Sequence, residues 1–196
     1  MALAGDRAPL TLSNMGPVRC SVAKAFGDWA RFGVDRAARQ LLGSPVAKIE
    51  TMGSYACRNV AGSERRSAHA RAEAIDVSAF VLADGRRIVL KRDWDGGDAA
   101  TREFLRVVHK SACKRFGTVL GPEYNAAHED HFHLEGAGAK FCFVNGLVAP
   151  HFCARQRSPS LALLQRLLIR ARLPLRRSCA ANFQRDPGRV SLGRSL

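Results

Sequence analysis

The stretch that decides the fold is AIDVSAFVLADGRRIVLK, residues 74–91. Residues 74–82 and 87–91 are rich in apolar and β-branched side chains, and residues 83–86 between them contain an Asp-Gly pair. A short polar turn with Asp-Gly between two such runs is typical of a β-hairpin. We therefore predict an antiparallel hairpin near the middle of the chain.

Helical and extended patterns lie on both sides of this hairpin. Apolar residues recur at three- and four-residue spacing in two segments, which predicts helices over residues 21–42, with Ser21 as N-cap, and 101–116. Short strands are predicted at residues 46–52, 118–120 and 131–134, with a polar loop over 53–67. This order predicts an α+β domain, a small antiparallel sheet with helices packed on one face.

The net charge of +14 is spread unevenly along the 196 residues. Residues 151–196 hold ten Arg and one Asp, so this segment carries +9 and residues 1–150 carry only +5. A specific nucleic-acid site needs its basic groove on the folded body. We therefore expect no specific nucleic-acid partner. No run of eighteen apolar residues is present, so we expect no transmembrane segment, and we expect a monomer.

Three segments differ in kind. Residues 1–17 lack the charged start and apolar stretch of a signal peptide and are predicted to be an unstructured leader remnant. Residues 18–150 carry the patterns of a folded domain. Residues 151–196 are predicted to be a basic tail, either disordered or a non-native reading frame. The alternative for this tail is a basic amphipathic helix over 161–173, suited to an anionic surface.

Six cysteines are present, and none forms a C-x-x-C pair, which argues against a zinc knuckle or a thioredoxin-type motif. Four of them lie in the predicted domain: Cys20, Cys57, Cys113 and Cys142. Two disulfides formed in an oxidising compartment are one interpretation, with three possible connectivities. Buried free thiols are the other.

His69 and Asp76 form the first candidate pair for chemistry. The Asp lies inside an apolar strand pattern, where a carboxylate is costly to bury unless it is paired or bound to a cation. His69 precedes that strand by a few residues and can reach the carboxylate from the loop. The pair alone is weak evidence, because a solvent-facing Asp on a half-buried strand is common.

The second cluster is His128-Glu129-Asp130-His131-Phe132-His133, which holds three of the six histidines. Successive side chains of a strand point to opposite faces, so His131 and His133 share a face and Phe132 packs behind them. Two imidazoles opposite a strand that carries an Asp predict an open zinc site, in which three protein ligands leave one position for water. A solvated His-rich loop is the alternative.

Several motifs in order resemble the bacterial extensin-like C-terminal domain. They run from about Cys20 to about Cys142 and comprise Gly53-Ser54-Tyr55-Ala56-Cys57-Arg58, Ser67-Ala68-His69-Ala70, Ala74-Ile75-Asp76-Val77, Thr118-Val119-Leu120-Gly121-Pro122, Tyr124-Asn125, His128 and Asp130-His131-Phe132-His133-Leu134. The S-x-H, Asp and H-x-H pattern also resembles the zinc site of the lysostaphin, D-alanyl-D-alanine metallopeptidase and hedgehog group.

The resemblance implies a role for each matching residue. It implies His69, Asp76 and His133 as zinc ligands, and His131 as the residue that assists the chemistry. Relatives with E-x-x-H use an acid at the position of Asp130. The Arg that follows a Tyr upstream of S-x-H, here Arg58, steadies the substrate carbonyl in the group. The four cysteines also match positions expected of the family, and a bridge at Cys57 would hold the loop of Arg58 rigid.

The activity implied is that of a zinc-dependent carboxypeptidase or endopeptidase acting on peptidoglycan peptides in the periplasm or cell envelope. The alternative is a zinc-containing, non-catalytic cell-wall binding module. One departure from the group is Ala72, where the group has Gly. Gly adopts positive φ angles that Ala resists, so the structure at Ala72 is needed to decide whether the loop around His69 has the backbone geometry that the resemblance implies.

Overall fold

The computed structural model describes residues 2–3, 9–138, 141–144 and 147–150. The predictions for residues 151–196 lie outside these ranges. A unit covering Met1–Cys153 holds all the elements, which are β1 (Ala2–Leu3), β2 (Leu10–Ser13), α1 (Cys20–Trp29), η1 (Ala30–Asp35), α2 (Arg36–Leu42), β3 (Val46–Gly53), η2 (His69–Arg71), β4 (Ala74–Leu82), β5 (Arg87–Val89), α3 (Leu90–Gly96), α4 (Ala99–Ala112), β6 (Thr118–Leu120), η3 (Ala126–His128), β7 (Phe132–Glu135), β8 (Phe141–Val144) and β9 (Leu147–Pro150). None of the described helices has the length and apolar character needed to cross a membrane.

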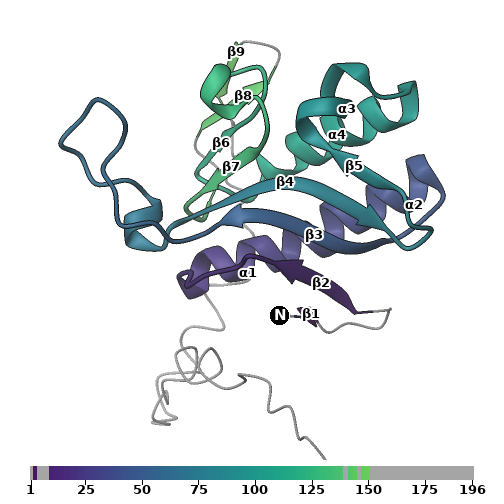
Figure 1. Ribbon diagram of the computed structural model, residues 1–196, viewed down its shortest axis with the longest axis horizontal. Coiled ribbons are helices and arrows are strands. Elements are labelled where there is room, and N and C mark those ends of the chain that lie inside the picture. The colour runs from purple at the N-terminus through teal and green to yellow at the C-terminus, as the bar shows by residue number, and fades with distance from the viewer. Residues whose placement is uncertain (1, 4–8, 139–140, 145–146, 151–196) are drawn as a thin grey trace, which may run out of the picture. The chain divides into compact units, whose positions relative to one another are not determined.

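The strands form one mixed sheet in the order β1-β2-β3-β4-β7-β6-β8-β9, with β5 paired to β4 (Figure 1). Most neighbours are antiparallel, but β2 runs parallel to β3, and β6 runs parallel to β8. The predicted α+β class is confirmed, although the sheet is larger than the small antiparallel sheet that we predicted. Strand β4 lies at its centre, between β3 and β7.

The predicted hairpin is present as β4 and β5, with Ala79 opposite Val89. The second strand is shorter than predicted, because Leu90 begins α3 instead of continuing β5. The Asp93 carboxylate accepts a hydrogen bond from the backbone N–H of Val89 at 2.8 Å, which satisfies a donor at the start of this helix. Leu90 and Trp94, one helical turn apart, are both buried, so this helix is stabilised by its packing.

The first helical segment extends over the predicted range but starts differently. It begins at Cys20, and its N-cap is Arg19 without a side-chain cap, so the prediction of Ser21 as N-cap is wrong. A π-helical turn, η1, interrupts it. There a Cβ atom on Gly33 would lie 2.4 Å from Ser111 Oγ of α4 and 3.0 Å from the Trp29 ring, so a larger residue would require these side chains to shift.

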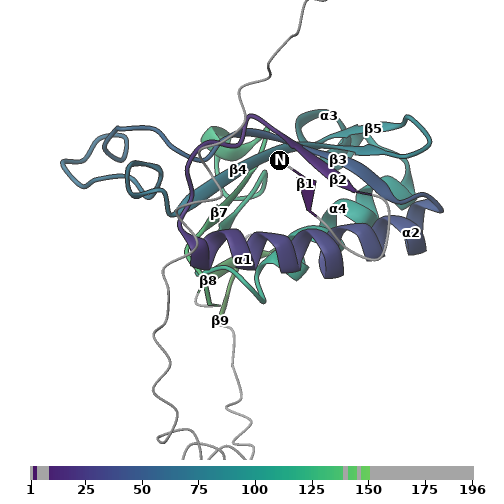
Figure 2. The ribbon, with the colours of Figure 1, turned by 90° about the horizontal axis from the view of Figure 1, so that it is seen from below.

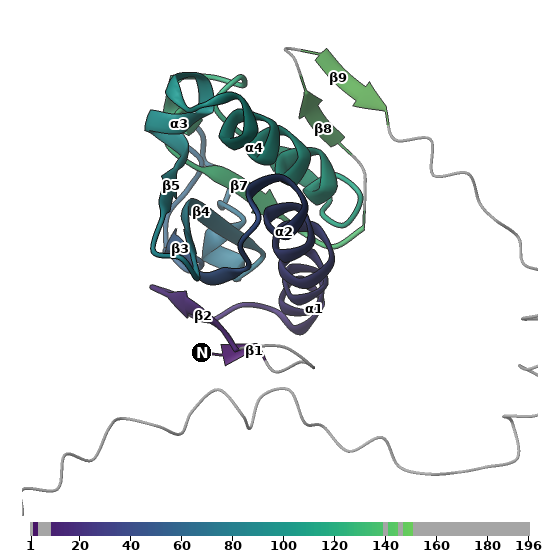
Figure 3. The same ribbon diagram turned by 90° about the vertical axis from the view of Figure 1, so that its right-hand side faces the viewer.

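The helices α1, α2 and α4 lie together on one face of the sheet (Figures 2 and 3). Between the two layers, the fully buried Trp29 ring packs edge-on against Phe80 and Phe116. Its indole N–H donates to the carbonyl of Val108 at 3.1 Å, so the polar atom of this large side chain is satisfied. These contacts attach α1 to both α4 and the central strand.

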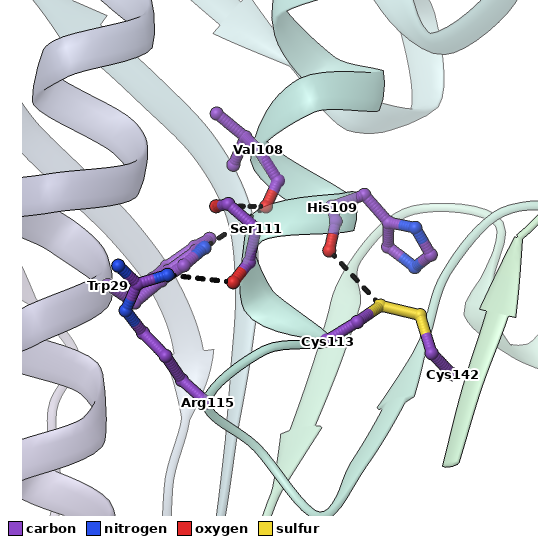
Figure 4. The surroundings of a disulfide bond; sticks show 7 residues. All are labelled: Trp29, Val108, His109, Ser111, Cys113, Arg115 and Cys142. Atoms are coloured by element: carbon purple, nitrogen blue, oxygen red, sulfur yellow. Dashed lines mark hydrogen bonds between the residues drawn. A yellow bond between two sulfur atoms is a disulfide. The ribbon is translucent and has the colours of Figure 1, made fainter. Parts of the chain in front are cut away.

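A disulfide between Cys113 and Cys142 joins the end of α4 to β8 (Figure 4). The Cys113 backbone forms the C-cap of α4, and both cysteines are buried. One disulfide among the four predicted cysteines is therefore present. Cys20 and Cys57 are both exposed, and a bridge between them stays a prediction.

Residues 10–13 correct the prediction of an unstructured segment over residues 1–17. They form β2, which pairs in parallel with residues 48–50 of β3. Leu10 is buried in the core, and the Thr11 hydroxyl donates to the carbonyl of Ala47 at 3.1 Å. Residues 10–13 alternate between apolar and polar side chains, but a pattern of four residues is too short to predict a strand. The partner strand also lies nearly forty residues away in the sequence.

Candidate metal centre

Three side chains from two strands and a short helix converge on one point. His69 Nε2 lies 3.1 Å from Asp76 Oδ2 and 3.2 Å from His133 Nδ1. His133 Nδ1 lies 2.9 Å from Asp76 Oδ1. Two imidazole nitrogens and one carboxylate therefore form a compact group, here called the donor triangle, in which each imidazole nitrogen contacts a different oxygen of the carboxylate. The sequence-predicted ligands are the residues that the fold brings together here.

The register of β4 and β7 places two of these donors. Asp76 stands directly opposite His133 in the antiparallel pair. The neighbouring pairs on the opposite face join buried core residues, Ile75 with Leu134 and Val77 with Phe132. Because side chains alternate along a strand, the face that carries Asp76 and His133 is the one turned away from this core.

The third donor comes from η2, just before β4. The Ser67 hydroxyl accepts a hydrogen bond from the His69 backbone N–H at 3.2 Å and so fixes the start of this turn. Ala72 ends it in the left-handed region, with φ 54° and ψ 35°. Ala72 therefore adopts the positive φ that Gly takes more readily, and it does so at a cost in backbone strain.

The electrostatics of the site favour a cation. Burial opposes ionisation of Asp76, but hydrogen bonds from His133 and His69 hold the pKa of its carboxyl well below the usual range. Burial alone would lower the pKa of His133, whereas its hydrogen bonds to Asp76 and Glu135 raise that pKa to about 9. The carboxylate is therefore ionised at neutral pH and attracts positive charge, either a proton or a metal ion.

His131 lies at the edge of the triangle. Strand β7 begins at Phe132, one residue later than predicted, so Asp130 and His131 belong to the turn that precedes it. The Asp130 carboxylate accepts a hydrogen bond from His131 Nδ1 at 2.7 Å. This leaves Nε2 as the unprotonated nitrogen of the neutral ring, and it lies 3.7 Å from Asp76 Oδ1. Asp130 therefore orients His131.

Two further residues at the site had no role in our sequence prediction. Glu135 Oε2 lies 3.4 Å from His133 Nε2, on the side away from the donor triangle. The alternation that joins His131 to His133 continues to Glu135 and could have indicated it. His128 stacks near His131, with ring centroids 5.1 Å apart, and its Nδ1 lies 2.7 Å from the Asn125 side-chain oxygen.

A cavity of about 670 Å³ opens over the donor triangle. One side of it is formed by the loop between β3 and β4, which extends beyond the ends of both strands in Figure 1. Arg58 belongs to this loop and lines the cavity, as the sequence prediction requires of a residue that contacts substrate. His128 and Tyr124 line the other side.

The family sequence model described as extensin-like protein C-terminus matches residues 1–143. The chain belongs to this family. The match spans the donor triangle, the loop of Arg58 and the disulfide of this extensin-like domain. Searches of curated proteins and of solved structures found no match.

Proposed function

We propose that this extensin-like domain is a zinc-dependent peptidase, a carboxypeptidase or endopeptidase that acts on peptidoglycan peptides in the cell envelope. The observation that carries the proposal is the convergence of His69, Asp76 and His133 beneath an open cavity. Its pattern resembles the zinc site of the lysostaphin and D-alanyl-D-alanine metallopeptidase group, which supports the choice of metal, reaction and substrate.

The donor set fits zinc in its chemistry and spacing. Zinc bonds to histidine nitrogen and carboxylate oxygen at about 2.0–2.1 Å, so donors of one tetrahedral site stand about 3.3 Å apart. The imidazole nitrogens of His133 and His69 lie 2.9 and 3.1 Å from different oxygens of the Asp76 carboxylate and 3.2 Å from each other. A set of three protein ligands is also typical of catalytic zinc sites, since structural sites use four.

A zinc ion at this site would act as a Lewis acid toward the scissile carbonyl and would acidify a water molecule there. His131 accepts the proton of the attacking water at Nε2, because Nδ1 donates to Asp130. The same ring can then return the proton to the leaving amine. The buried position of His131 beside Asp76 keeps it within reach of the reacting atoms.

Arg58 stabilises the negative charge that develops on the carbonyl oxygen. Its side chain is exposed in the cavity wall, and its backbone carbonyl is held by the Ser67 N–H at 3.1 Å. Ser67 in turn fixes His69, so the arginine and a metal ligand are attached to the same short segment. A preorganised donor of this kind commonly contributes about 3 kcal/mol to transition-state stabilisation.

The test compares two neighbouring histidines that both line the cavity. His133→Ala should lose both bound zinc and hydrolysis, because it removes a ligand, whereas His131→Ala should retain zinc and lose at least about 100-fold in rate. Zinc is measured by elemental analysis of the dialysed protein, and hydrolysis by peptides released from purified peptidoglycan. Zinc loss in His131→Ala would overturn the division of roles. Zinc binding without any released peptide from the wild-type protein would favour a non-catalytic cell-wall binding module.

A further inference from the structure

The loop that forms one side of the cavity has a defined backbone. The Ser67 N–H donates to the carbonyl of Arg58 at 3.1 Å, and the Val60 N–H donates to the carbonyl of Arg65 at 2.8 Å. Between these rungs, residues 59 and 66 form an antiparallel bridge. Residues 58–67 are thus a small hairpin attached to the metal centre through η2.

The pairing of this hairpin places two arginines on the same face. Residues opposite each other in an antiparallel pair share a face, and successive residues alternate. Arg58 and Arg65 therefore lie on one face, and both line the cavity. Arg66, although it borders the cavity, belongs to the other face, where its guanidinium donates to Cys57 Sγ at 3.2 Å.

These two arginines differ from most others in the described part of the chain. Most of the other guanidinium groups bond to carboxylates or carbonyls, as for Arg87 with Glu50 at 2.6 Å and Arg92 with Asp93 at 2.7 Å. Within the described ranges, no side-chain hydrogen bond or ion pair within 4 Å is formed by Arg58 or Arg65.

One acid of the cavity, Glu135, is already engaged. It contacts His133, its other oxygen lies 3.9 Å from Arg71, and Arg65 acts on it only at longer range, through its charge. Two adjacent cations of one wall therefore face the cavity without a bonded anion. Such a pair recruits an anionic group, and the fork of donors on arginine matches a carboxylate.

The hairpin also sets the spacing of the two arginines along the cavity wall. The rung of Arg58 and Ser67 comes two residues before His69, and the rung of Arg65 and Val60 lies further out on the same face. Same-face positions on a strand are about 7 Å apart. An extended peptide advances about 3.4 Å per residue, so this distance corresponds to about two residues of substrate.

We propose that Arg65, with Arg58 beside it, binds a carboxylate of the substrate. The substrate is accordingly an acidic peptide, and its carboxylate lies about two residues from the scissile amide. This inference rests on the proposed peptidase function and names the substrate class of the same site. Arg58, the arginine nearer to His69 along the hairpin, stabilises the scissile carbonyl oxygen, and Arg65 is the additional specificity-determining residue.

The test uses the full-length, zinc-loaded His131→Ala protein, in which binding is measured without turnover. The probes are two synthetic peptides of equal length, acetyl-Ala-Ala-Ala-Glu-amide and its Gln counterpart, titrated by calorimetry. Arg65→Gln should weaken binding of the Glu peptide by about 10- to 100-fold, the usual effect of losing a hydrogen bond to a charged group. Arg65→Gln should leave the affinity for the Gln peptide unchanged. Arg65→Lys should restore part of the affinity for the Glu peptide.

The matched control is Arg36→Gln. Arg36 is an exposed arginine of α2, outside the cavity and likewise without a side-chain ion pair in the described ranges, so its loss changes the net charge equally. Equal effects of the two Gln variants, or equal affinity of the wild-type site for both peptides, would overturn the inference. Tighter, Arg65-dependent binding of a short oligothymidylate would overturn the peptide assignment.

Hydrolysis by the protein with His131 intact separates the two proposals. Preference for the Glu peptide without detectable cleavage of any peptide would support the carboxylate site and contradict the peptidase function. Cleavage of both peptides at equal rates, unchanged by Arg65→Gln, would support the peptidase and contradict the carboxylate site. Circular dichroism of Arg65→Gln verifies that the variant is folded.

Discussion

His133 and His109 are two nearly buried histidines whose surroundings are opposite. His133 lies on β7 between two carboxylates, Asp76 and Glu135. His109 lies on α4 against the rings of Trp94 and Phe132, and its Nε2 has no hydrogen-bond partner among the described residues. Carboxylate neighbours raise the pKa of His133 to about 9, whereas burial, and then the charge of Arg106, lower that of His109 to about 4.

Phe132 lies between the surroundings of His133 and those of His109. Phe132 precedes His133 on β7, and its ring packs 5.0 Å from that of His109, between centroids. Because successive side chains of a strand alternate, β7 presents the candidate metal site on one face and the core on the other. The comparison shows that burial alone does not make a histidine a candidate ligand, since carboxylates must also converge on it.

A pH titration tests the core histidine and should give the largest effect. The pKa of His109 is about 4 in the folded state against 6.5 in the unfolded chain, so the unfolded chain binds more protons in this range. Stability is full above about pH 6.5 and falls by about 3 kcal/mol as the pH drops through 4. Urea unfolding of the metal-free protein at pH 7 and pH 4 measures this loss.

His109→Leu is the matched variant for that titration. It removes the titrating group and an unpartnered buried nitrogen, so the acid loss should shrink by about 3 kcal/mol relative to wild type. Superimposable pH profiles of the two proteins would show that His109 does not titrate as an apolar core group.

The site histidine should show the opposite sign. Its folded pKa of about 9 exceeds the unfolded value of 6.5, so its contribution is present below pH 6.5 and is lost as the pH rises through 9. The expected change in the metal-free protein is of the same order, about 3 kcal/mol at most. Thermal melts between pH 6 and pH 10 should show this loss for wild type but not for His133→Gln.

Glu135 gives a smaller effect that sharpens the contrast between the two histidines. Its contact with His133 Nε2 orients the imidazole ring so that Nδ1 faces the donor triangle. Losing a residue that orients a metal ligand commonly lowers metal affinity 10- to 100-fold, and we expect about tenfold here. Glu135→Ala should weaken zinc binding in a competition with a chromophoric chelator. Glu73→Ala is the control, since Glu73 contacts Arg71 at 2.6 Å without contacting His133. An equal loss in both variants would assign the effect to Arg71.

Ala72→Gly should give the smallest change, and in the stabilising direction. Ala72 has φ 54°, which strains a residue with a Cβ atom. Glycine should relieve this strain and stabilise the fold by about 1 kcal/mol, while zinc affinity stays unchanged. Chemical unfolding measures the gain. A loss of stability would mean that the greater freedom of glycine in the unfolded chain outweighs the relief.

Part of this architecture could be predicted because it is local. The Asp-Gly turn predicts the hairpin of β4 and β5, and the alternation from His131 to His133 predicts a shared face. Ser67, two residues before His69, was identified only as part of the motif, and the structure shows that its hydroxyl accepts a hydrogen bond from the His69 N–H. By contrast, the start of α3 at Leu90 was not predicted, because it depends on the hydrogen bond from the Val89 N–H to Asp93 and on the packing of Trp94.

The sequence by itself determined the residue types and their side-chain period, which indicated two imidazoles opposite an Asp, and its family resemblance implied His69, Asp76 and His133 as the donors. Only the tertiary structure decided that Asp76 stands opposite His133, a contact across 57 residues of chain, and that Cys113 pairs with Cys142. It also decided that Glu135 joins the site while His109 enters the core. The physical reason is that side-chain periods arise within one strand, whereas the pairing of distant strands depends on the register and packing of the whole sheet.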